Sequence, residues 1–70
     1  MKTDATMLRR TDAVACDTAP DGTYSGLWSG CHVGFSVGGV WYECQTRDGV
    51  RGIRIPCVVT IAGGRITVSA

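Results

Sequence analysis

The sequence predicts a small all-β, mainly antiparallel domain, because three turn signals punctuate segments in which apolar and polar residues alternate. The pairs Gly38-Gly39, Asp48-Gly49 and Gly63-Gly64 each stand between β-branched or aromatic runs. Such pairs supply the positive φ values of a two-residue hairpin loop. We therefore expect a five-stranded curled sheet or barrel, comparable in size to SH3 and OB domains, with a short N-terminal helix or a flexible arm.

Length and composition limit the chain to one domain. It has 70 residues, of which 44% are hydrophobic and 19% charged, which is typical of a globular chain. The formal net charge of +1 gives no general attraction to nucleic acid or to anionic membranes. There is no secretory signal and no apolar stretch long enough to span a bilayer, so we expect a cytoplasmic protein with no membrane partner.

Residues 1–22 differ in character from residues 23–70, the predicted β domain. Residues 4–15 can form one or two helical turns capped by Thr3 or Asp4, or they can remain a flexible arm, and the sequence leaves both alternatives open. Residues 19–22, Ala-Pro-Asp-Gly, predict a turn that leads into the β domain.

The three turns fix the register of the predicted strands. Residues 23–28 are expected to form one strand, and residues 50–62 a long strand, bent near Gly52 or Pro56, that pairs with two neighbours. Two-residue loops leave no freedom to slip, so directly opposed residues can be named. The expected pairs are Phe35–Tyr42, Cys44–Ile53 and Val59–Val68.

This register sorts the side chains into two faces, because side chains alternate along a strand. The expected inward face holds Cys31, Val33, Phe35, Tyr42, Cys44, Ile53, Ile55, Cys57, Val59, Ile61, Ile66 and Val68. The expected outward face holds His32, Gly34, Ser36, Trp41, Glu43, Gln45, Gly52, Arg54, Val58, Thr60, Thr67 and Ser69.

The four cysteines lack the close spacing of a structural zinc site. We interpret Cys31, Cys44 and Cys57 as small buried hydrophobic residues, with a disulfide or a metal site as the alternatives. Strand alternation points His32 away from Cys31, so the two do not form a catalytic Cys–His pair. We expect no enzymatic activity, no metal and no cofactor.

Trp41 is the residue that folding alone explains least. It is expected on the polar face beside Ser36 and Gly34, with Glu43 paired to Arg54 across the strands. Exposed aromatic residues flanked by arginine suit protein interfaces and base stacking alike. The alternative is that the N-terminal segment or Trp28 covers the Trp41 side chain.

These observations favour a small non-enzymatic protein-binding module, or an inhibitor-like interaction protein, that acts through a sheet surface or a sheet edge. The candidate binding residues are Trp41, Glu43, Arg54, His32 and Arg51, and the partner is another protein chain or a second copy of this one. One alternative is a nucleic-acid-binding barrel in which Arg47, Arg51 and Arg54 contact phosphates. Another is a structural subunit of a larger assembly.

Overall fold

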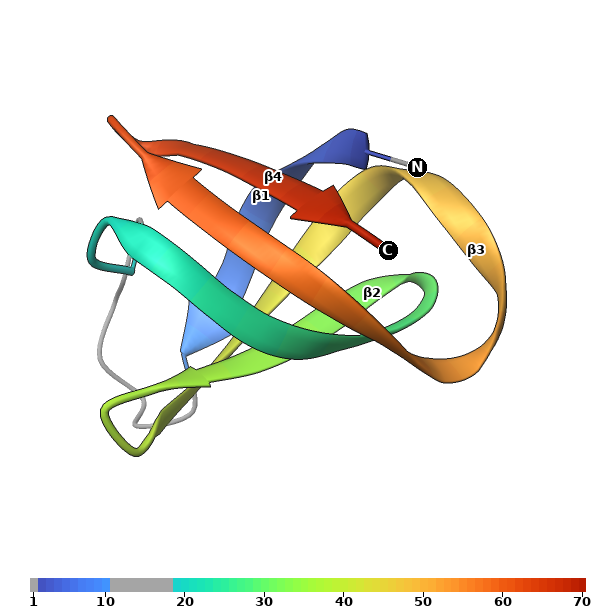
Figure 1. Cartoon of the computed structure of the whole chain (residues 1–70), viewed down its shortest axis with the longest axis horizontal. Helices are drawn as coiled ribbons and strands as arrows, with labels where there is room; N and C mark the ends of the chain where they lie inside the picture. The colour runs from blue at the N-terminus through green and yellow to red at the C-terminus, as the bar shows by residue number, and fades with distance from the viewer. Residues whose placement is uncertain (1, 11–18) are drawn as a thin grey trace.

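The computed structural model of this chain describes residues 2–10 and 19–70, and for residues 8–10 it describes the backbone only. This part contains four strands and no helix, hence no helix that could cross a membrane. All strand pairings are antiparallel, which confirms the all-β fold class. The strands are β1 (Lys2–Arg10), β2 (Gly22–Val37), β3 (Val40–Ala62) and β4 (Arg65–Ser69) (Figure 1).

The long strands β2 and β3 form one hairpin that bends back on itself. They pair from Val37–Val40 at the turn to Gly22–Ile61 at the far end. Figure 1 shows both strands curling over near the middle of their lengths. The backbone permits this because Gly30 in β2 and Gly52 in β3 adopt positive φ values of 59° and 112°. The halves of each strand thus lie in two layers, and the rings of Tyr24 and Phe35, from opposite halves of β2, stack at 5.7 Å.

Strand β1 closes the curled sheet. Its N-terminal part pairs with β4, its C-terminal part pairs with β3, and Ala5 lies opposite a residue of each strand. The strand order is therefore β1-β4-β3-β2, with an additional pairing between β1 and β3. The result is one sheet of four strands, and the expectation of five strands is not confirmed.

The predicted N-terminal helix is also not confirmed. Over residues 4–10 the chain forms strand β1. Thr3, Ala5 and Met7 point toward the core, while Lys2, Asp4 and Thr6 between and beside them are exposed. This alternation has the period of a strand. Residues 11–15 of the predicted helix lie outside the described residues.

The core lies between the two layers and contains most of the residues predicted for the inward face. The ring of Phe35 stacks between those of Tyr24 and Tyr42, at centroid distances of 5.7 and 5.5 Å. Ile55 is partly buried at the margin of the core. The buried apolar residues are Ala19, Trp28, Val33, Phe35, Tyr42, Cys44, Cys57, Val59, Ile61, Ile66 and Val68.

Two of the three predicted pairings are confirmed, and the third is wrong. Phe35 lies opposite Tyr42 and Val59 opposite Val68, as the Gly-Gly turns require. Cys44 instead lies opposite Val33 and Met7, because Asp48-Gly49 is not a hairpin turn and β3 runs through it. β3 bends a few residues later, at Gly52, as predicted, and at Arg54, whose φ is 59°.

Two residues of the predicted inward face, Ile53 and Cys31, are exposed instead, each for its own reason. Ile53 lies at the bend of β3 and is 81% exposed. Cys31 is exposed because the register shifts on both sides of Gly30 interrupt the alternation of side chains along β2. Such bulges turn the following side chain away from the face that parity alone assigns to it.

Candidate functional site

A groove of about 400 Å³ lies on the outer surface of the sheet, where β2 and β3 run side by side. We call it the Trp41 groove. It brings together four of the five predicted binding residues, and Arg51 does not line it. Its lining residues are Leu27, Ser29, His32, Gly34, Trp41, Glu43 and Arg54.

The tight turn at Gly38-Gly39 builds the floor of the groove. It sets Trp41 opposite Ser36, and Glu43 opposite Gly34. A Cβ atom at Gly34 would lie only 2.1 Å from Cζ2 of Trp41, so the indole occupies the space that a side chain at Gly34 would fill. Trp28 is fully buried in the core and is not the residue that covers Trp41, which remains 37% exposed as a residue.

The carboxylate of Glu43 contacts two other residues of the groove, Trp41 and His32. One carboxylate oxygen accepts a hydrogen bond from the indole nitrogen of Trp41 at 3.2 Å. The other oxygen lies 3.4 Å from Nε2 of His32, which forms an ion pair when the imidazole is protonated. The indole is therefore held both by van der Waals contact with the backbone of Gly34 and by a hydrogen bond to a carboxylate.

The predicted cross-strand pair of Glu43 and Arg54 rests on the Asp48-Gly49 register and is wrong as a pairing. Glu43 lies opposite Gly34 in β2 and opposite Arg9 in β1. Arg54 nevertheless lines the same groove, because the bend of β3 brings it to this surface. Its side chain is exposed there.

Leu27 and Ser29 are the lining residues that the sequence analysis did not identify. Leu27 is opposite Pro56 and is 43% exposed. Its position depends on the bend of β2 at Gly30, which local alternation does not reveal. The groove thus combines the apolar surfaces of Leu27 and Trp41 with an arginine, which suits a ligand that carries an apolar side chain beside an anionic group.

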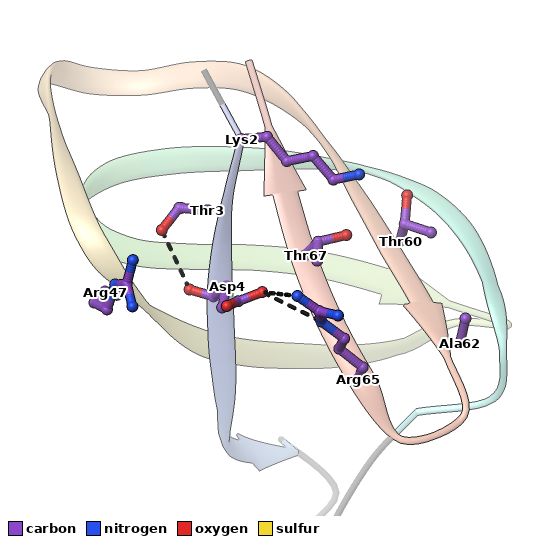
Figure 2. A pocket seen from close by; sticks show the side chains of 8 residues that line it. All are labelled: Lys2, Thr3, Asp4, Arg47, Thr60, Ala62, Arg65 and Thr67. Atoms are coloured by element: carbon purple, nitrogen blue, oxygen red, sulfur yellow. Dashed lines mark hydrogen bonds and ion pairs between the residues drawn. The ribbon is translucent and has the colours of Figure 1, made fainter.

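A second groove, of about 490 Å³, lies over β1, β3 and β4 (Figure 2). We call it the basic groove, since Lys2, Arg47 and Arg65 line it together with Asp4. Arg47 was one of three arginines predicted as phosphate contacts. The structure separates the three: Arg47 lines this groove, Arg54 lines the Trp41 groove, and Arg51 lines neither.

The cysteines of the described residues are free thiols, two of them in the core. Burial, together with the nearby Cys57, raises the pKa of Cys44 to about 11. Burial also raises the pKa of Cys57. Both thiols therefore remain protonated at neutral pH and act as small apolar residues. Across residues 2–10 and 19–70, no three His, Cys, Asp or Glu side chains gather as a metal site would require.

Comparison with protein-family models, with curated proteins and with solved structures finds no significant match to this chain.

Proposed function

We propose that this protein is a small non-enzymatic binding module whose Trp41 groove holds a segment of another protein chain. The observation that supports this most directly is the state of Trp41: the residue is 37% exposed, yet its indole is held by Gly34 and by a hydrogen bond to Glu43. A side chain that is already ordered loses little conformational entropy when a partner covers it. Tryptophan and arginine are also the residue types that most often dominate interface energies.

The chemistry of the groove defines the kind of segment it would accept. The exposed surfaces of Leu27 and Trp41 would pack against one apolar side chain, and Arg54 would pair with a neighbouring carboxylate. A volume of about 400 Å³ matches one or two side chains rather than a folded domain. The proposed ligand is therefore a short, extended, acidic-apolar segment, supplied by another protein or by a second copy of this chain.

The proposal can be tested with peptides selected from a random displayed library against the purified protein. We expect Trp41→Ala to weaken binding of the selected peptides by about 30-fold or more, since truncating an interface tryptophan commonly costs about 2 kcal/mol. The matched control is Val58→Ala, which removes an exposed apolar side chain outside both grooves. It should change affinity by less than about twofold.

Two further measurements make the outcome decisive. Circular dichroism and thermal unfolding of Trp41→Ala verify that the variant is folded, because an unfolded variant would mean that Trp41 is a structural residue. Sedimentation equilibrium of the wild type and of this variant tests a second copy as the partner. A folded Trp41→Ala protein that binds the peptides normally and self-associates as the wild type does would contradict the proposal.

A further inference from the structure

The basic groove shares no lining residue with the Trp41 groove and collects charge from three strands. Lys2 comes from β1, Arg47 from β3 and Arg65 from β4, while Asp4 is the single carboxylate among the lining residues that the structure describes. These described residues, three cations and one carboxylate, give the lining a formal charge of +2, although the whole chain carries only +1. Hydroxyl groups complete the polar lining, from Thr3, Thr60 and Thr67.

Asp4 and Arg65 form an ion pair at the centre of this groove. Nη2 and Nε of Arg65 donate to the same carboxylate oxygen of Asp4, at 3.2 and 3.4 Å. The side chains are 74% and 52% exposed for Arg65 and Asp4, respectively. An exposed ion pair of this kind contributes little to stability, so an anion of higher charge can displace the carboxylate from Arg65.

We propose that the basic groove binds ligands that carry two or more neighbouring phosphate groups. Figure 2 shows Arg47 and Arg65 on opposite sides of β1, with Asp4 between them, and the side chain of Lys2 extending over β4. Guanidinium groups bind phosphate oxygens through paired hydrogen bonds, and the hydroxyls of Thr60 and Thr67 add further donors. Cations spread over three strands match a row of phosphates better than one isolated anion.

The lining also indicates how such a ligand would be recognised. No aromatic side chain lines this groove, so it offers no surface on which a base could stack. Recognition would depend on the phosphates alone. The ligand is then either an inorganic polyphosphate or the backbone of a nucleic acid held without regard to sequence.

Asp4 and Arg65 provide the test, because two substitutions break the same ion pair and have opposite effects on the charge of the groove. We expect Asp4→Asn to tighten binding about threefold or more, since it removes the carboxylate that competes for Arg65. Arg65→Gln should weaken binding about tenfold or more. Arg51→Gln, the matched control for an exposed arginine outside the groove, should change affinity by less than about twofold.

Two probes distinguish the sources of phosphate: inorganic tripolyphosphate measured by calorimetry, and a labelled mixed-sequence oligonucleotide of about 10 nucleotides measured by fluorescence anisotropy. Both are used at about 50 mM salt and then at rising salt. For the single-stranded oligonucleotide, Arg65→Gln should reduce the slope of log K against log salt concentration by about 0.7, the loss of one phosphate contact. Binding of either probe with this pattern of variants supports the proposal and names the source. Trp41→Ala should leave this binding unchanged, which separates it from the proposed function.

Three results would overturn the inference. One is the absence of binding to both probes at low salt. Another is that Asp4→Asn and Arg65→Gln weaken binding equally, because the ion pair would then act only by holding β1 against β4. The last is that Arg51→Gln weakens binding as much as Arg65→Gln, because the attraction would then be a property of the whole surface.

Discussion

Trp41 owes its conformation to the missing side chain at Gly34. The indole lies where a Cβ atom would stand, and the carboxylate of Glu43 accepts its N–H. Neither residue has an unusual sequence context, but a two-residue turn at Gly38-Gly39 brings them together. At the scale of single residues, the Trp41 groove is thus a consequence of strand register.

Gly34→Ala tests this contact. The added methyl group would approach the indole to 2.1 Å, so Trp41 must leave its position or the strands must shift. We expect a loss of about 1–3 kcal/mol in the free energy of unfolding, measured by urea denaturation, as for other overpacked sites. The indole N–H resonance of Trp41 should also move.

Ser36→Ala is the control, because Ser36 occupies the same face of β2 directly opposite Trp41. It should leave both the stability and the resonance nearly unchanged. If Gly34→Ala is as stable as the wild type and its indole resonance is unmoved, the close packing of Trp41 on Gly34 is refuted.

At the scale of elements, the sequence correctly predicts the two Gly-Gly hairpins. It wrongly predicts a third hairpin at Asp48-Gly49, where β3 continues as one strand. A Gly-Gly pair between β-branched residues has few other uses, so Phe35–Tyr42 and Val59–Val68 follow from it. Asp48-Gly49 is less specific, because here the hydroxyl of Thr46 donates to the carbonyl of Asp48 within a continuous strand. β3 bends instead at Gly52 and Arg54, which agrees with the bend near Gly52 that the sequence predicted for this long strand.

Four of the five candidate binding residues still lie together despite this error, for a physical reason. His32, Trp41 and Glu43 take their face from the Gly38-Gly39 turn alone, which was predicted correctly. Arg54 reaches the groove through the bend of β3, which the sequence predicted near Gly52 or Pro56, whereas Leu27 was missed because β2 bends at Gly30. Local alternation therefore predicts the floor of the groove, whereas its rim depends on how the long strands fold over.

Arg54 adopts a left-handed backbone conformation with a φ of 59°. This conformation costs a residue with a Cβ roughly 1 kcal/mol, which glycine does not incur. We therefore expect Arg54→Gly to leave the free energy of unfolding unchanged or to raise it by up to about 1 kcal/mol in urea denaturation.

Arg51→Gly is the matched control, since Arg51 is an exposed strand residue without a positive φ. It should destabilise the protein by about 0.5–1 kcal/mol through the entropy of glycine in a strand. A larger loss of stability from Arg54→Gly than from Arg51→Gly would contradict the left-handed conformation of Arg54 at the bend of β3.

At the scale of the whole molecule, β1 converts a bent hairpin into a closed arrangement. Ala5 lies opposite Thr46 in β3 and opposite Ile66 in β4, so a single residue joins the two layers. A domain of 70 residues has a small core, and its free energy of unfolding is only about 0.05–0.15 kcal/mol per residue. The loss of one strand pairing is therefore a large fraction of its stability. Sequence alternation alone could not distinguish this strand from a short helix, because only the partners on both sides decide it.

Ala5→Pro tests whether β1 is a structural strand. Proline cannot donate a hydrogen bond to a ladder, and at Ala5 it would interrupt the strand that joins both layers. We expect the variant to be destabilised by about 2 kcal/mol or more, seen as a fall in melting temperature of about 10 °C or more, because each kcal/mol lowers it by about 4–8 °C.

Lys2→Pro is the control, because Lys2 is the first residue of β1, where proline is tolerated. Its melting temperature should remain close to that of the wild type. Equal tolerance of both substitutions would mean that residues 2–10 are a dispensable arm rather than part of the sheet.

The proposed function depends on where a bound protein segment lies. The most direct measurement is the ¹H–¹⁵N spectrum of the labelled protein during titration with a peptide selected from a displayed library. We expect the largest shifts at the indole N–H of Trp41 and at the backbone amides of Gly34 and Arg54, which line the Trp41 groove. Shifts centred instead on Arg65 and Thr67, or an indole signal of Trp41 that stays in place at saturation, would contradict the account.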